Sequence, residues 1–145
     1  RPLPVLHELA DGDTIDLGGR LLDAIHIPGH TMGSILLLDR NTKLLLSGDT
    51  FTRRLLYGIS GVVPMDEFCN RLRRLEDAPF DTAFSAHDRC ALPKGHLHTM
   101  LDAITHDLPN AEKKFSIPFA GKLLCLTRGV ETELDYFDMA YWKKA

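Results

Sequence analysis

The sequence has little of what several protein classes require. Its three cysteines, Cys69, Cys90 and Cys125, are far apart and form no CxxC pair, which argues against a disulfide framework or a thiolate zinc site. No apolar run approaches the roughly 20 residues of a membrane-spanning helix, so we expect no membrane partner. The 17 Lys and Arg against 20 Asp and Glu give a net charge of −3, which offers no electrostatic footprint for nucleic acid. We expect a small-molecule substrate and a cytoplasmic protein.

The composition is that of an ordinary globular domain. Apolar residues make up 44% of the chain and charged residues 26%, which argues against disorder. A length of 145 residues gives room for one domain, so residues 1–145 are interpreted as a single unit. The chain opens at Arg1 without an initiator Met. We therefore expect that sequence once preceded it, and the lack of a signal peptide says little about the compartment.

Hydrophobic periodicity predicts a mixed α/β fold. The apolar runs 35–38 and 44–46 flank a polar turn of hairpin length, and they are continuous, so we expect both faces of these strands to be covered. Helical spacing predicts amphipathic helices over 66–75, with Asp66 as N-cap, and over 94–107. The other predicted strands cover 14–17, 20–27, 82–85, 122–127 and 134–142.

Three possible metal ligands each follow an apolar strand-like run. They are His30 in PGHTMGS, Asp49 in LLLSGDT and His87 in FSAHD. Imidazole nitrogen and carboxylate oxygen are ligands that zinc prefers, and strand ends can direct such groups toward one point. Taken singly, each has an ordinary explanation as a loop histidine or a turn-forming aspartate. Their succession, each after its own strand, favours a metal centre.

These motifs resemble the metallo-β-lactamase superfamily, and in particular its glyoxalase II-like hydrolases. The matching segments are ADGDTIDLGG, IPGHTMGS, LLLSGDTF and FDTAFSAHD. The resemblance implies an α/β fold, the αββα sandwich with its metal site at the edge between two sheets. It covers roughly Leu9 to His87 and fades beyond, so we interpret the chain as the C-terminal half of that sandwich, lacking the N-terminal half.

The resemblance also implies a role for each ligand. His30 would bind the first of two divalent ions, Asp49 would bridge both in a catalytic role, and His87 would bind the second. The ions would be zinc, with iron or manganese possible. As a hydrolase, such a protein would attack a thioester, lactone or similar small acyl substrate through a metal-bound hydroxide.

One part of the family pattern is absent. The HxHxDH cluster should precede PGHT by several dozen residues, but only His7 and His26 stand there, and His26 is more typical of a packed or backbone-bonded histidine. The site would therefore be incomplete or empty, and the 145-residue fragment inactive alone. Exposed apolar sheet surface would lead it to form a homo-oligomer or to associate with the missing half.

The second predicted helix offers a substitute ligand set. His98, Asp102 and His106 recur every four residues and share one helix face. The order is wrong for the family, and a solvated face with an Asp-His pair explains the spacing, so the set is not adopted.

Several questions of function stay open at the level of sequence. An iron-dependent redox member of the same fold would use the same ligand types, and a non-catalytic domain could keep the motifs without metal. Specificity lies in loops, and the segment 52–64 is predicted to line a pocket, with Arg53, Arg54 and Tyr57 as substrate-binding candidates. A solvated basic turn is the alternative for the two arginines.

Overall fold

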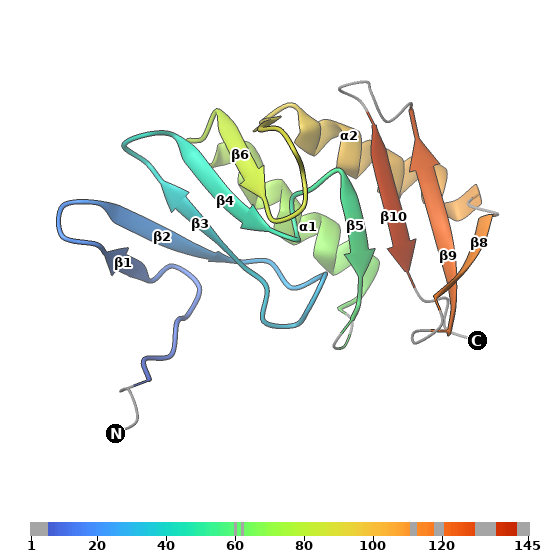
Figure 1. The fold of residues 1–145 in the computed structure, drawn as a ribbon, viewed down its shortest axis with the longest axis horizontal. Coiled ribbons are helices and arrows are strands. Elements are labelled where there is room, and N and C mark those ends of the chain that lie inside the picture. Colours follow the sequence, from blue (N-terminus) through green and yellow to red (C-terminus); the bar gives the residue numbers. More distant parts are fainter. Residues whose placement is uncertain are drawn as a thin grey trace.

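The computed structural model describes residues 6–59, 61, 63–110, 113–117, 121–129 and 136–141. Its strands form a six-stranded sheet of order β1-β2-β3-β4-β6-β7 and a four-stranded sheet of order β5-β10-β9-β8 (Figure 1). The predicted α/β class is therefore confirmed. The first sheet contains β1 (Thr14–Asp16), β2 (Leu21–His26), β3 (Ile35–Asp39), β4 (Leu44–Gly48), β6 (Thr82–Ser85) and β7 (Leu92–Pro93). The second contains β5 (Arg54–Tyr57), β8 (Lys113–Ile117), β9 (Gly121–Arg128) and β10 (Phe137–Tyr141).

The directions of the strands in the first sheet determine where its loops meet. β2 pairs antiparallel with β3, and β3 pairs antiparallel with β4 through the predicted hairpin. β4 then pairs parallel with β6. The strands β2, β4 and β6 therefore run in the same direction, and their carboxyl ends lie at one edge of the sheet. The segments that follow these three strands are thus brought together there.

The two faces of the six-stranded sheet have different environments. On one face Leu36, Leu38 and Leu45 are buried in a core cluster that also contains Phe68 and Leu72 of α1 (Met65–Asp77). Figure 1 shows α1 behind this sheet, whereas α2 (His96–Asp102) lies between β6 and β10 in the view.

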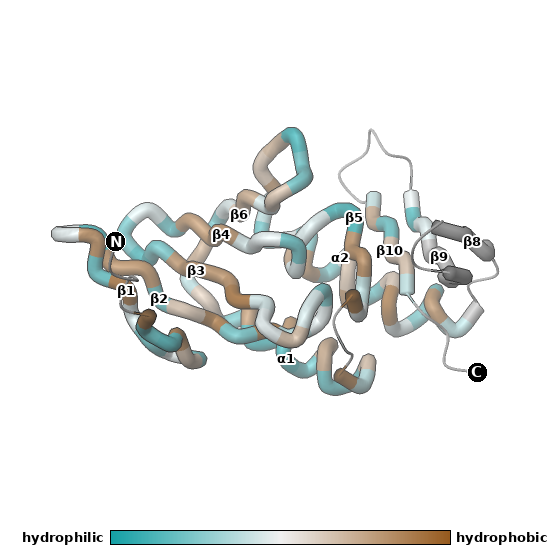
Figure 2. Tube along the Cα trace, turned by 60° about the horizontal axis from the view of Figure 1, so that its bottom comes forward, coloured by the Kyte–Doolittle hydropathy of each residue, from teal (hydrophilic) through white to brown (hydrophobic). Residues whose placement is uncertain are grey.

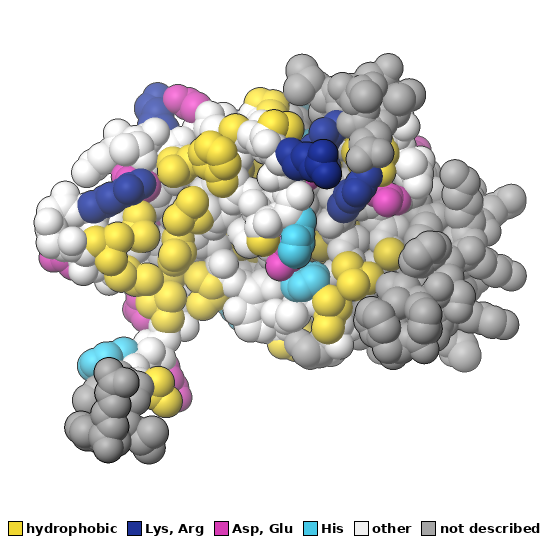
Figure 3. All heavy atoms as spheres, viewed as in Figure 1, with side chains coloured by type: hydrophobic (Ala, Val, Ile, Leu, Met, Phe, Trp, Pro, Cys, Tyr) yellow, Lys and Arg dark blue, Asp and Glu magenta, His cyan; other side chains and the backbone are white. Residues whose placement is uncertain are grey.

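The other face carries a row of apolar side chains in register. Leu37 pairs with Leu46, and Leu46 pairs with Phe84. The exposed fractions of Leu46 and Phe84 are 39% and 49%, and apolar side chains gather on this face in Figure 3. Figure 2 shows the apolar stretches of β2, β3 and β4 side by side. The prediction that both faces are covered is wrong for the described residues, because the apolar second face has no layer over it.

The helices follow the predicted periodicity, but their ends differ. α1 begins one residue earlier than predicted and ends two residues later, with Pro64 at its N-cap. Asp66 lies in its first turn, where a carboxylate interacts favourably with the helix dipole, so its predicted N-cap role is wrong. The second predicted helix is broken into α2, a π-helical turn over Ala103–Asp107 and a 3-10 turn over Leu108–Asn110.

Three strands differ from the prediction, and the two predicted for the tail agree with it. β9 and β10 lie within or close to the two strands predicted for the tail, although 134, 135 and 142 fall outside the described residues. β7 and β8 were not predicted, and β5 lies inside the segment 52–64 that was interpreted as a loop. β5 is a strand because it pairs in parallel with β10, a partner more than 80 residues away in sequence.

Within the described ranges, no helix is both long enough and apolar enough to span a bilayer. Two of the three thiols are described, Cys69 as buried and Cys90 as exposed, and both are free. Burial raises the pKa of the Cys69 thiol.

Candidate metal centre

The loop that carries His30 is fixed from two sides. Gly29 lies against the ring of Phe68 in α1, so closely that a Cβ at this position would be 2.4 Å from the Phe68 Cε2. On the other side, the amides of Gly58 and Ile59 donate to the carbonyls of Gly29 and His30 at 2.7 and 2.8 Å. The glycine of PGHT is therefore required by close packing on α1.

The imidazole of His30 is oriented by the backbone of β5. Its Nδ1 lies 2.7 Å from the carbonyl oxygen of Leu56, which makes Nδ1 the protonated nitrogen. Nε2 then carries the lone pair and faces Asp49. A hydrogen bond from the outer nitrogen to a carbonyl is the arrangement by which proteins fix metal-binding histidines.

Asp49 follows an irregularity at the end of β4. The pairing of β4 with β6 shifts between Leu46 and Gly48, and Gly48 adopts a φ of +52°, in the left-handed region that favours glycine. The amide of Ala86 donates to the carbonyl of Gly48 at 2.8 Å. This bond ties the loop of Asp49 directly to the loop of His87.

The structure brings the three predicted residues together around one carboxylate. Asp49 Oδ2 lies 3.7 Å from His30 Nε2, and Asp49 Oδ1 lies 3.2 Å from His87 Nε2. Each carboxylate oxygen therefore faces a different histidine. The side chain of His87 is 77% exposed, against 20% for His30, so the second histidine is open to solvent. Figure 3 shows two histidine side chains beside an acidic one on this face.

Asp88 holds the loop of His87 in place. Its Oδ2 accepts hydrogen bonds from Ser85 Oγ at 2.6 Å, Thr52 Oγ1 at 3.0 Å and the Arg53 amide at 3.1 Å. Its own amide donates back to Ser85 Oγ at 3.0 Å. One carboxylate therefore links the segment after β6 to the segment that leads into β5.

The donor types fit part of a two-metal site, and their arrangement is incomplete. Across the described ranges, no group of three or more His, Cys, Asp and Glu side chains is arranged to hold a metal ion. The pairwise distances agree with this, because His30 and His87 approach opposite oxygens of Asp49. One histidine and one carboxylate oxygen are thus available on each side. A metal centre here would need ligands from beyond these three residues.

The alternative ligand set on the second helix does not assemble. His106 lies 3.2 Å from Asp102, as the spacing of four predicts, but Asp102 is also bound to Arg128 at 3.0 Å. The guanidinium of Arg128 holds the pKa of Asp102 below its usual value. His98 is exposed. His26, as predicted, bonds to backbone, with its Nε2 2.8 Å from the carbonyl oxygen of Met32.

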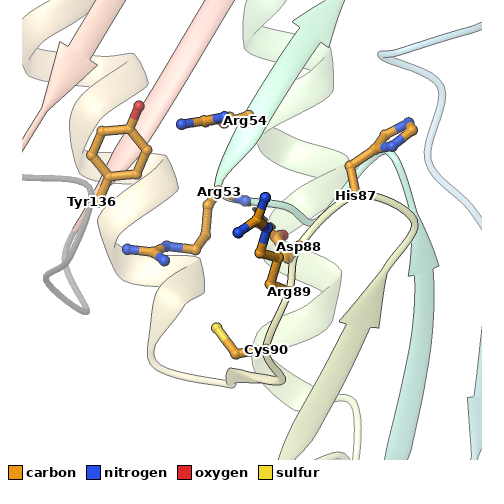
Figure 4. A pocket seen from close by; sticks show the side chains of 7 residues that line it. All are labelled: Arg53, Arg54, His87, Asp88, Arg89, Cys90 and Tyr136. Atoms are coloured by element: carbon orange, nitrogen blue, oxygen red, sulfur yellow. Dashed lines mark hydrogen bonds between the residues drawn. The ribbon is translucent and has the colours of Figure 1, made fainter.

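The predicted substrate-binding residues separate into two groups. Arg53 and Arg54 line a pocket beside His87, together with Asp88, Arg89, Cys90 and Tyr136 (Figure 4). Tyr57 does not line it, because its ring is buried in the core and its hydroxyl donates to the carbonyl of Val63. Burial raises the pKa of Tyr57 to about 12. The prediction that Tyr57 binds the substrate is therefore wrong, because its side chain lies in the core.

Sequence reasoning did not assign four of the residues that line this pocket: Asp88, Arg89, Cys90 and Tyr136. Arg89 follows the predicted ligand His87 by two positions, so a search for charges near the ligands could have found it. Tyr136 carries no local signal, because it reaches the pocket only through the pairing of β10 with β5.

The structure combines a β-sheet, helices on one of its faces, and histidine and aspartate side chains that follow strands running in the same direction. The sequence matches the family model of the Metallo-beta-lactamase superfamily over residues 1–89. The chain therefore belongs to the metallo-β-lactamase superfamily, as the motifs predicted.

Solved structures agree with this fold. A metallo-beta-lactamase family protein of Thermus thermophilus, TTHA1429, aligns with a TM-score of 0.57 and 21% identity, over 77% of this chain and 36% of that one. A beta-lactamase domain protein of Burkholderia ambifaria aligns with a TM-score of 0.57 and 22% identity, over 78% and 37%.

Among curated proteins, the chain is similar to acyl-coenzyme A thioesterase MBLAC2 of Homo sapiens and of Bos taurus. Each is 56% identical over 41 residues, which is 28% of this chain and 15% of the relative. The chain thus spans only a small part of these relatives.

Proposed function

We propose that this chain supplies half of the ligand set of a metal-dependent acyl hydrolase whose substrate is a thioester. The observation that supports this most directly is the position of Asp49 between His30 and His87, at 3.7 and 3.2 Å. His30 and one oxygen of Asp49 would hold one divalent ion, and His87 and the other oxygen would hold the second. Zinc is the ion proposed. Thioester chemistry is proposed because the curated relatives are acyl-coenzyme A thioesterases.

The roles of the residues follow from their contacts. When bound, paired divalent ions activate water and polarise the acyl oxygen. His30 would present Nε2 because its Nδ1 is held by the Leu56 carbonyl, and Asp49 would keep the two imidazoles on opposite sides. Asp88 would keep the His87 loop in register with the segment before β5. The three ligands alone are too few, so we propose that the isolated 145-residue chain is inactive.

The remaining ligands would come with the layer that covers the open sheet face. Leu37, Leu46 and Phe84 form an apolar row there, and a surface of that kind is unfavourable in water. The family's solved structures are more than twice as long as the part this chain matches. We propose that this apolar sheet face is covered by a β-layer of the family fold, and that this layer lies outside the described residues. The alternative is that a second copy of this chain covers the face. A dimer in a sedimentation experiment would favour that alternative. Cytoplasmic location stays a prediction.

The test uses the protein recovered from its own host through an affinity tag next to this chain, so that any further polypeptide is retained. The purified material is analysed for metal, and the release of free thiol from an acyl-coenzyme A is measured. We expect bound zinc and thiol release, with Asp49→Asn abolishing the activity and the matched Asp102→Asn leaving it intact. Iron without thiol release would favour a redox enzyme, and neither metal nor activity would favour a non-catalytic domain.

A further inference from the structure

A second polar region adjoins the candidate metal centre. The pocket beside His87 has a volume of about 310 Å³, at the lower end of the range for small-ligand sites. Figure 4 shows His87 at one end and Tyr136 at the other, with the side chains of Arg53 and Arg54 extending toward Tyr136. Because His87 belongs to both regions, one ligand could occupy the pocket and reach the metal centre.

Basic side chains predominate among the described residues that line this pocket. They include three guanidiniums, from Arg53, Arg54 and Arg89, and one carboxylate, from Asp88. The Oδ2 atom of that carboxylate already accepts three hydrogen bonds, which hold the surrounding loops together. Arg54 is the first residue of β5 and Arg53 precedes it, whereas Arg89 comes from the loop after β6. The fold itself collects them.

Two of the three guanidiniums lie close to one aromatic ring. The Arg53 and Arg54 Cζ atoms lie 5.3 and 5.9 Å from the centre of the Tyr136 ring, within the range of cation–π contact. Tyr136 is itself only 7% exposed, so the ring is a fixed support. Guanidiniums held on a rigid ring lose less freedom when they bind an anion, and their planar forks match the oxygens of phosphate.

We infer that this pocket binds the phosphate groups of the substrate, and that the substrate is therefore a thioester on a phosphorylated carrier. The inference rests on the proposed function, and it narrows the substrate class, because a lactone or a simple ester carries no phosphate that the three arginines could bind. The phosphate end of the carrier lies among Arg53, Arg54 and Arg89, and the thioester extends past His87 toward Asp49.

The first experiment measures the pocket without any metal. Pyrophosphate is titrated into the chain by calorimetry in a buffer with EDTA, so that binding to a metal ion contributes nothing. We expect binding that weakens about tenfold or more for each of Arg53→Gln and Arg54→Gln, since a charge-assisted hydrogen bond is lost. Arg73→Gln, on α1 and away from the pocket, is the matched control and should bind as the wild type does. Raising the salt concentration should weaken binding.

If the wild type and the Arg53→Gln and Arg54→Gln variants bind pyrophosphate equally well, the bound pyrophosphate is an adventitious ion only. The inference would then be overturned. Absence of pyrophosphate binding by the wild type would equally overturn the inference. Circular dichroism of each variant establishes that it is folded before it is titrated.

The second experiment separates this inference from the proposed function. On the active material from the host, Arg53→Gln should raise the KM for an acyl-coenzyme A about tenfold, with kcat little changed. The KM for a short N-acetylcysteamine thioester, which has no phosphate, should not change. If no thioester is hydrolysed while pyrophosphate still binds in EDTA, the proposed function fails and the anion site stands. If both thioesters show the same KM in wild type and variant, the anion site is not part of the substrate site.

Discussion

Two regions of this molecule carry the same kinds of metal-binding side chains, and only one brings them to a common point. At the sheet edge, His30, Asp49 and His87 come from loops far apart in the sequence and meet around one carboxylate. In the second helical region, His98, Asp102 and His106 are close in sequence, but Asp102 is bound to Arg128. Strand ends that point to one edge bring distant loops together. On an exposed helix, by contrast, the side chains point outward and form ion pairs with neighbouring residues.

The largest expected difference between the two regions is in metal affinity. Asp49→Asn removes the carboxylate proposed as a ligand of both ions, so we expect the affinity of the chain for Zn²⁺ to fall by about 100-fold or more, since even the loss of an outer-shell partner costs roughly 10- to 100-fold. Asp102→Asn should leave it unchanged. Titration of the histidine resonances with Zn²⁺ measures both. Equal losses in the two variants would remove the distinction between the regions.

The next largest effect concerns the packing that fixes the His30 loop. Gly29→Ala places a Cβ 2.4 Å from the Phe68 ring, and we expect it to lower the free energy of unfolding by ~1–3 kcal/mol through overpacking. Gly33→Ala, in the same loop, meets nothing within 4 Å and is the matched control. Urea denaturation measures both. A Gly29→Ala protein as stable as Gly33→Ala would show that α1 does not constrain the loop.

A smaller loss is expected at the anchor of the His87 loop. Asp88→Ala leaves Ser85, Thr52 and the Arg53 amide without their common acceptor, and we expect ~1–2 kcal/mol of destabilisation. Asp81→Ala is the control, since that exposed carboxylate forms a surface ion pair with Lys43 at 3.4 Å. Hydrogen exchange of the Arg53 amide should accelerate in Asp88→Ala alone. Unchanged exchange there would contradict the anchoring role.

The smallest effect belongs to the helical region and depends on pH. The pKa of Asp102 is lowered in the folded state, first by its bond to Arg128. A carboxyl group whose pKa is lowered by folding stabilises the protein at pH values above 3.8, the pKa of the group in the unfolded chain. This stabilisation is lost as the pH falls through the folded pKa. Asp102→Asn should therefore reduce stability slightly at pH 7 and by less at pH 2. Unfolding curves at the two pH values measure this, and a loss of equal size at both would contradict the ion-pair role.

The sequence predicted the parts of the fold that have local causes. The hairpin of β3 and β4 and the helix α1 follow from periodicity and turn residues, and the three loop ligands follow from their positions after strands. β5 was missed because its strand character comes from pairing with β10, far along the chain. The same pairing brings Tyr136 to Arg53 and Arg54, so the complete pocket could not be predicted from local patterns. Tyr57 was misplaced because alternation along β5 turns it into the core.

The central claim is that His30, Asp49 and His87 act as one partial metal centre. The most direct measurement is a titration of the chain with Co²⁺, followed by the paramagnetic shifts of the imidazole Nε2 and ring protons of each histidine. The account predicts that His30 and His87 shift together, that His98 and His106 do not, and that Asp49→Asn removes the shifts. Shifts at His98 and His106 with His30 and His87 unaffected would contradict it.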